Sequence, residues 1–298
     1  MTPQDFDYLR SLLKERSGLV LSADKQYLAE SRLLPVARRN GLSNLNELVE
    51  KLKSRVTDAV ATSVVEAMTT NETFFFRDKI PFEHFRRVIV PALIETHHRR
   101  HRIRIWCTAA STGQEPYSLA MVLCELADQL KGWRLDILAT DISNDVLEKA
   151  KAGLYSQFEV QRGLPIHELV KYFTQNGEVW QISPELRSMV TFRQMNLLHD
   201  FSHLGFFDLV FCRNVLIYFD QKTKAGVLER LAQVIEPTGF LVLGAAETVV
   251  GLTDAFKPHH SYRGLYVPNP AKLTPDDTST PRPANPGAKI VKFASAKR

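Results

Sequence analysis

From residue 100 onward, short segments rich in β-branched and aromatic residues alternate with segments whose apolar residues recur at helical spacing. The strand-like segments are 103–107, 135–140, 208–212, 240–244 and 263–267. Each of the first three is followed along the chain by an amphipathic helical segment. This alternation is typical of a mostly parallel sheet with helices on both faces. The sequence therefore predicts an α/β fold for the larger part of the chain.

Three segments depart from this alternation. Residues 1–70 contain four helical segments and no strand candidate, which predicts an all-α N-terminal domain. Residues 153–190 include the alternating run from Val179 to Ile182, which predicts a small antiparallel β-subdomain inserted into a main domain of residues 71–267. Residues 268–298 hold six prolines and few large apolar residues, so we expect a disordered tail there.

Local signals predict where some helices begin and end. The second helix is expected over 24–40 and should end at Asn40-Gly41, because both residue types tolerate the left-handed conformation. Ser43 is expected to cap the third helix, and Ser143 the helix that follows the strand at 135–140.

Composition narrows the cellular setting and the chemistry. Hydrophobic residues make up 44% of the 298 positions, and no apolar run approaches the roughly 20 residues that span a bilayer. The first ten residues lack a signal-peptide pattern, so we expect a cytoplasmic protein without direct membrane insertion. Cys107, Cys124 and Cys212 are far apart and lie among apolar residues. We expect them to be reduced, packed thiols.

The net charge of +5 does not predict nucleic-acid binding, because the tail contributes +4 of it. The densest basic run, 97–102, is expected to be a solvated connector before the first strand. His97 and His101 have helical spacing but lack a third ligand, so no metal site is expected.

Small or polar residues follow three predicted strands, at the edge where open α/β sheets bind ligands. They are the turn 107–113, Asp141, and the segment 213–219. A carboxylate at Asp141 can accept hydrogen bonds from ribose hydroxyls, or it can cap the next helix. The other two segments have structural alternatives as well, an ordinary strand–helix turn and an anchored loop. Glu115, in the first helix after the turn, is favoured there by the helix dipole alone.

Six motifs in this order resemble the chemotaxis receptor methyltransferases, the CheR family, and the resemblance covers residues 1–267. The motifs are NETFFFR (71–77), CTAASTGQEPYSL (107–119), ATDIS (139–143), MNLL (195–198), FCRNVLIYFD (211–220) and GAAET (244–248). The resemblance implies a Rossmann-like S-adenosylmethionine-dependent methyltransferase domain with a small antiparallel β-subdomain, preceded in the chain by the all-α domain. The activity that it implies is protein-glutamate O-methylation of chemoreceptors, with S-adenosylhomocysteine as product.

The resemblance also implies roles for individual residues. Arg77 and Tyr218 would form the catalytic centre. The residues implied to contact S-adenosylmethionine are Asn71, Thr73, Arg77, Glu115, Asp141, Asn196, Leu197, Arg213 and Asn214. Arg77 could hold a carboxylate of either the cofactor or the substrate, and positioning of the cofactor is favoured because a clamp would blunt the attacking oxygen.

The expected partners are the acidic methylation helices of chemoreceptors. Arg32, Arg38 and Arg39 on the second helix could meet them, or could form an ordinary solvated basic face. Two positions depart from the family pattern. Gln114 stands where an acidic residue is common, and the turn 174–178 is short and poor in glycine. The second departure argues against tethering to a receptor's C-terminal pentapeptide.

Two other functions remain open from the sequence. An RNA methyltransferase would share the fold, but the near-neutral charge of residues 1–267 and the lack of an Asn/Asp-Pro-Pro-aromatic motif do not favour it. A non-catalytic adaptor that binds receptors would not need Arg77, Asp141 and Tyr218, all of which are present.

Overall fold

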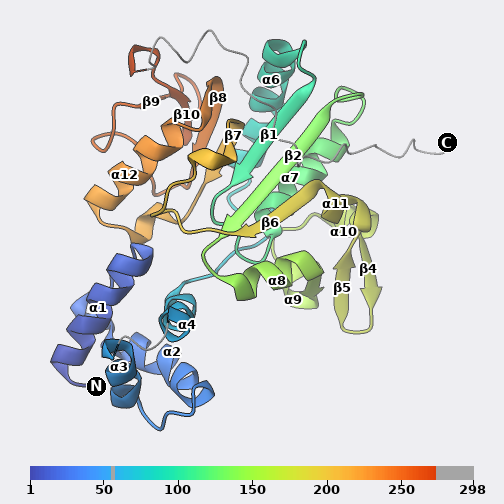
Figure 1. Cartoon of the computed structure of the whole chain (residues 1–298). Coiled ribbons are helices and arrows are strands. Elements are labelled where there is room, and N and C mark those ends of the chain that lie inside the picture. The colour runs from blue at the N-terminus through green and yellow to red at the C-terminus, as the bar shows by residue number, and fades with distance from the viewer. Residues whose placement is uncertain (55–57, 273–298) are drawn as a thin grey trace.

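A computed structural model of the protein describes residues 1–54 and 58–272. A helical unit at the N-terminus lies beside an α/β unit built on one large sheet, and a small hairpin-like sheet projects from the latter (Figure 1). Within these described residues, no helix is both long enough and apolar enough to cross a membrane.

The N-terminal helices pack around one apolar core that contains Leu9, Leu33 and Val64. The helices are α1 (Pro3–Ser17), α2 (Gln26–Arg39), α3 (Leu45–Lys53) and α4 (Asp58–Met68), with a 3-10 turn, η1 (Ala23–Lys25), before α2.

Two of the predicted helix boundaries can be compared with these helices. Gly41 adopts a left-handed φ of 72° and donates its N–H to the Arg38 carbonyl, so the predicted end of the second helix is confirmed. The cap expected at Ser43 is wrong. Asn44 caps α3, because its side chain accepts the Glu47 N–H, whereas Ser43 gives its own N–H to the Glu47 carboxylate.

The large sheet has seven strands in the order β6-β2-β1-β7-β8-β10-β9. The strands are β1 (Arg102–Cys107), β2 (Arg134–Asp141), β6 (Val190–Gln194), β7 (Phe207–Cys212), β8 (Ile235–Leu243), β9 (Phe256–Pro258) and β10 (Leu265–Pro268). The first five in this spatial order run parallel, while β10 is antiparallel to both β8 and β9. The five predicted strands are confirmed, and β6 and β9 were not predicted.

Successive side chains of a strand point to opposite faces, and two separate cores result. Ile105 joins the core under α7, whereas its neighbour Trp106 joins the core that includes Val227 of α12. The covering segments are α5 (Ile80–His84), the π-helical segment η2 (Phe85–Ile89), α6 (Val90–His97), α7 (Gln114–Glu125), α8 (Asn144–Ala152) and α12 (Gln221–Ala232).

The predicted antiparallel insertion is also confirmed. Its three strands are ordered β3-β5-β4 and pair antiparallel. The elements of this region are β3 (Leu154–Ser156), α9 (Gln157–Gln161), α10 (Ile166–Tyr172), β4 (Phe173–Asn176), β5 (Val179–Ile182) and α11 (Pro184–Met189).

Residues 268–272, the first five of the expected tail, are part of the folded domain. Pro268 ends β10, and the Asn269 N–H donates to the Ala255 carbonyl, so this part of the chain is held against the domain. Pro270–Lys272 form one more 3-10 turn, η5. The rest of the expected tail, 273–298, lies outside the described residues.

The basic run at 97–102 is only in part the solvated connector that we expected, because residues 98–101 are exposed but several side chains of the run pair with carboxylates of the sheet. His97 is buried, and its Nδ1 atom lies 3.2 Å from an Asp208 carboxylate oxygen. Arg100 pairs with the same carboxylate at 2.9 Å, and Arg102 pairs with Asp136 at 2.8 Å. The run therefore neutralises acidic side chains at the amino-terminal edge of the sheet. Burial lowers the pKa of His97 to about 4.

The cysteines are packed and free, as expected. Cys107 and Cys212 are buried and Cys124 is half-buried, and none forms a disulfide. Burial raises the pKa of all three thiols, which disfavours the reactive thiolate.

Candidate active site

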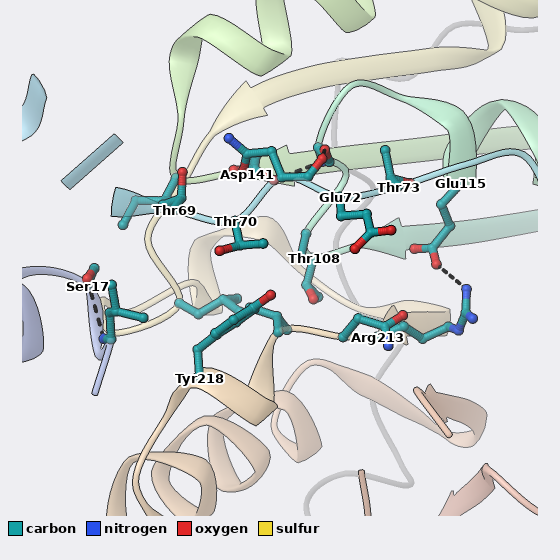
Figure 2. Close-up of a pocket in the computed structure, with 18 of the residues that line it drawn as sticks. Ser17, Thr69, Thr70, Glu72, Thr73, Thr108, Glu115, Asp141, Arg213 and Tyr218 are labelled. Atoms are coloured by element: carbon teal, nitrogen blue, oxygen red, sulfur yellow. Dashed lines mark hydrogen bonds and ion pairs between the residues drawn. The ribbon is translucent and has the colours of Figure 1, made fainter. Parts of the chain in front are cut away.

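A pocket of about 950 Å³, open solvent at its mouth included, lies at the carboxyl edge of the parallel strands (Figure 2). The predicted catalytic and cofactor-contacting residues all line it, from segments far apart in the chain. They are Asn71, Thr73, Arg77, Glu115, Asp141, Asn196, Leu197, Arg213, Asn214 and Tyr218.

Asp141 joins the end of β2 to the turn after β1. One carboxylate oxygen accepts the Ser111 N–H at 2.8 Å, and the other accepts the Ser143 N–H at 3.0 Å. Ser111 has a left-handed φ of 49°, a strained conformation for a residue other than glycine. Burial raises the pKa of Asp141, and these two backbone hydrogen bonds oppose that rise.

The helix-capping alternative for Asp141 is not realised, because its carboxylate binds the N–H of Ser143, which precedes the first turn of α8, and the Asn144 N–H donates to Glu66. Each oxygen has a second lone pair, and Asp141 still lines the pocket. The expected side-chain cap from Ser143 is wrong, because its hydroxyl makes no capping bond and Asp141 binds its backbone instead.

The segment 71–77 is anchored by its aromatic residues. Phe75 is fully buried and packs edge-on against Tyr155 at 5.1 Å between ring centroids, so it fastens the segment to the insertion. The Phe76 N–H donates to the Ser118 hydroxyl on α7 at 3.0 Å. Arg77 remains half-buried at the pocket, where its Nη1 donates to the Glu72 carbonyl at 2.7 Å.

Arg213 is a buried cation that ties the end of β7 to two other segments. Its guanidinium lies 2.7 Å from the Glu115 carboxylate and 2.7 Å from the Asp78 carboxylate, and it donates to the Arg77 carbonyl. Burial raises the pKa of Glu115, and the Arg213 cation opposes this. The position of Glu115 is therefore explained by an ion pair as well as by the helix dipole.

Several residues with a part in the site were not predicted. Glu247 accepts backbone N–H groups from the loop after β7. Its motif, GAAET, was noticed, but nothing in the local sequence shows which loop the carboxylate reaches. Asp78 was missed as well, although it directly follows a quoted motif.

The helical unit supplies part of the pocket wall, which the sequence did not indicate. The unpredicted wall residues are Ser17 and Leu19, at and just after the end of α1, and Thr69 and Thr70, which follow α4. The Val20 N–H donates to the Tyr218 carbonyl at 2.9 Å, and the Asn196 side chain donates to the Arg16 carbonyl at 2.6 Å. The two units therefore meet at the pocket.

The three arginines expected to meet receptors lie outside the pocket lining and differ in their surroundings. Arg32 is half-buried and donates to the carbonyls of Met68 and Thr69 at the end of α4, an internal role that the sequence did not predict. Arg38 and Arg39 are exposed at the end of α2.

An α/β domain with an acid at the end of its second strand and a pocket at the carboxyl edge of its sheet has the architecture of a protein that binds a nucleoside-containing cofactor. The model of the CheR methyltransferase S-adenosylmethionine-binding domain matches residues 71–265, and that of the CheR all-alpha domain matches residues 4–69. The chain belongs to the CheR methyltransferase family and is an S-adenosylmethionine-dependent chemotaxis protein methyltransferase.

Relatives with this name occur in several bacteria. Chemotaxis protein methyltransferase 1 of Pseudomonas aeruginosa is 42% identical over 258 residues, which cover 85% of this chain and 93% of that protein. Chemotaxis protein methyltransferase 1 of Vibrio cholerae is 37% identical, over 86% of this chain and 94% of its own length. The Salmonella typhimurium protein is 35% identical over 88% of both.

Proposed function

We propose that this protein methylates glutamate side chains in the cytoplasmic helices of chemoreceptors, giving glutamate methyl esters and S-adenosylhomocysteine. The observation that carries the proposal is the convergence of Asp141, Arg77 and Tyr218 on one pocket at the carboxyl edge of the sheet. An adaptor without catalysis would have no need for this convergence.

The chemistry of the pocket fits S-adenosylmethionine. Asp141 would accept hydrogen bonds from the ribose hydroxyls, as acids at this position of open α/β sheets do. Arg77 would bind the carboxylate of the methionine part, and Glu115 would accept from its ammonium group. Thr108 also lines the pocket, where its hydroxyl could bind a polar atom of the ligand.

Arg213 would act on the cofactor site through its neighbours. Its guanidinium forms ion pairs with Glu115 and Asp78 and donates a hydrogen bond to the Arg77 carbonyl. It therefore positions Glu115 and Arg77, which would bind the ammonium and the carboxylate of the methionine part. Asn71, Thr73, Asn196, Leu197 and Asn214 would complete the contacts to the cofactor.

The reaction needs alignment more than acid–base chemistry. Bound S-adenosylmethionine supplies an electrophilic methyl group on a sulfonium, which an ionised carboxylate attacks in line. A glutamate with an ordinary pKa of about 4.3 is already ionised at neutral pH, so no general base is required. Tyr218 would orient the substrate through its hydroxyl. Correct alignment can contribute about 7–11 kcal/mol, and a partly dry pocket favours a step in which opposite charges cancel.

The exposed Arg38 and Arg39 would meet the acidic methylation helices, while Arg32 would shape the link between α4 and the pocket. The short turn between β4 and β5 supports methylation without a pentapeptide tether. The expected setting is the cytoplasm, where the methylation helices of receptors lie.

The direct test uses labelled S-adenosylmethionine and receptor cytoplasmic fragments. We expect base-labile label on glutamate. Arg77→Ala and Asp141→Ala should each lower the initial rate by about 10²-fold, because misplacement of a reactant by about 1 Å can cost this much.

Exposed residues of the same types serve as controls. Arg99→Ala and Asp145→Ala should leave the rate unchanged. Label on RNA instead of receptor, or no binding of S-adenosylmethionine by calorimetry, would contradict the proposal and favour one of the two alternative functions.

A further inference from the structure

Glu247 holds the loop that carries Tyr218. One of its carboxylate oxygens accepts the N–H groups of Val215, Leu216 and Ile217 at 3.0, 2.8 and 3.3 Å. The other accepts the Asn214 N–H at 2.8 Å. Four consecutive backbone donors are therefore directed at a single carboxylate that is only 9% exposed.

The Glu247 carboxylate also accepts a hydrogen bond from its own segment of the chain. Gly244, directly after β8, donates its N–H to Glu247 at 2.8 Å. A Cβ atom at Gly244 would lie 2.6 Å from the Glu247 Oε2 atom and 3.0 Å from the Asn214 nitrogen. The site accordingly requires glycine at 244, and the end of β8, the Glu247 carboxylate and the loop after β7 form one closely packed unit.

This unit determines where Tyr218 lies. Asn214 has a left-handed φ of 57°, a conformation that asparagine tolerates, and its hydrogen bond to Glu247 holds it there. The loop then makes a single 3-10 turn, η4 (Leu216–Tyr218), which ends at the tyrosine. On the other side, the Val20 N–H donates to the Tyr218 carbonyl. The backbone of Tyr218 is thus held between Glu247 and the helical unit.

We propose that Glu247 is a positioning residue for methyl transfer, which acts by fixing the 214–218 loop so that the Tyr218 hydroxyl faces the reacting methyl group. This inference rests on the proposed role of Tyr218. The buried carboxylate is required as an acceptor on both oxygens, because donors approach it from both sides.

The substitution Glu247→Gln tests the hydrogen-bond acceptance of the side chain without changing its volume. In either orientation its amide NH₂ faces at least one backbone N–H, so part of the network breaks while the side-chain volume is kept. We expect kcat at saturating S-adenosylmethionine and receptor fragment to fall by about 10²-fold, as for comparable misplacement of a reactive group.

A double-mutant cycle tests whether the effect passes through Tyr218. In a Tyr218→Phe background, Glu247→Gln should lower kcat only a few-fold, because the hydroxyl that it positions is already gone. The inference is overturned if the two losses multiply fully, if Tyr218→Phe has no effect, or if Glu247→Gln leaves kcat unchanged.

Two further measurements separate this inference from general stability and from the proposed function. Asp208→Asn alters another buried carboxylate that accepts a backbone N–H, that of Arg104 at 2.7 Å, but at the opposite edge of the sheet. It should lower the melting temperature and leave kcat unchanged. Independently of activity, Glu247→Gln should speed amide exchange at residues 214–217; unchanged exchange there refutes the anchoring role even if no receptor is methylated.

Discussion

At the scale of single residues, Glu168 shows how burial sets the protonation of a side chain. It is 2% exposed on α10 and lies beside Glu125, which pairs with Arg86 at 2.7 Å. Burial, followed by the hydrogen bond and the charge of Glu125, raises the pKa of Glu168 to about 8. His167 completes the only group of possible metal ligands among residues 1–54 and 58–272. The Arg86 cation already compensates the acidic charge there.

The raised pKa has a consequence for stability. Between about pH 4.5 and about pH 8 the folded protein keeps a proton on Glu168 that the unfolded chain has lost, so stability falls as the pH rises through this window. Glu168→Gln cannot ionise and should escape that loss. A rise of the pKa from about 4.5 to about 8 corresponds to about 5 kcal/mol, so at about pH 9 we expect its melting temperature to exceed that of the wild type by about 10 °C or more.

Thermal melts at two pH values check this expectation. At about pH 5, where both forms are neutral, Glu168→Gln and the wild type should melt together. Glu178→Gln, on the exposed turn between β4 and β5, is the control and should show no difference that depends on pH. An offset of the same size at both pH values for Glu168→Gln would contradict the assignment.

At the scale of elements, two glycines end helices in the same conformation but in different surroundings. Gly18 follows α1 with a φ of 78°, and Gly41 follows α2 with a φ of 72°. A Cβ atom at Gly41 would meet nothing within 4 Å, whereas at Gly18 it would lie 2.9 Å from the Phe219 ring. Gly18 therefore permits both the end of α1 and its contact with the residue after Tyr218.

This pair gives a matched experiment. Gly41→Ala should cost about 1 kcal/mol through backbone strain alone. Gly18→Ala carries the same strain and also displaces Phe219, so it should cost more and also reduce kcat. Urea unfolding and initial rates of methyl transfer measure the two effects. Equal unfolding free energies and rates for the two variants would show that the contact with Phe219 is unimportant.

Elements were predictable from the sequence where burial makes their pattern strong. The central strands β1, β2 and β7 are mostly buried, and each contains a run of buried apolar residues towards its carboxyl end. In contrast, β6 is an edge strand with mixed exposure and starts directly where α11 ends, so no turn signal separates the two. The strand β9 has only three residues. Such short edge elements depend on pairing, which a local pattern does not reveal.

The site was predictable only where motifs could be compared with a family. The resemblance supplied the pocket-lining residues that strand and helix patterns alone left ambiguous. It did not supply the contacts between them, such as Arg213 with Asp78, 135 residues apart, or Asn196 with Arg16, 180 residues apart. Pairs at this separation are created by the fold, and no spacing rule identifies them.

At the scale of the whole molecule, the pocket belongs to both units. Besides the wall residues from the helical unit, an ion pair joins Lys14 of α1 to Asp220 at 2.7 Å, and the Glu66 carboxylate of α4 accepts the Asn144 N–H at 2.7 Å. Both contacts involve residues close in sequence to the pocket, because Asp220 follows Tyr218 by two residues and Asn144 follows Asp141 by three. A ligand in the pocket therefore contacts both units at once.

S-adenosylhomocysteine should then stabilise both units together. At a ligand concentration about 100 times the Kd, binding adds about 2.7 kcal/mol to the folded state. Amide exchange should slow at residues 18–20 and 69–73 of the helical side as well as at 108–113 after β1. The edge strand β9 lies at the far side of the sheet, next to β10, and we expect it to exchange by local opening, at rates that the ligand does not change. Asp141→Ala should abolish the protection in both units, because the ligand no longer binds. Protection confined to the α/β unit in the wild type would mean that the helical unit does not contact the ligand.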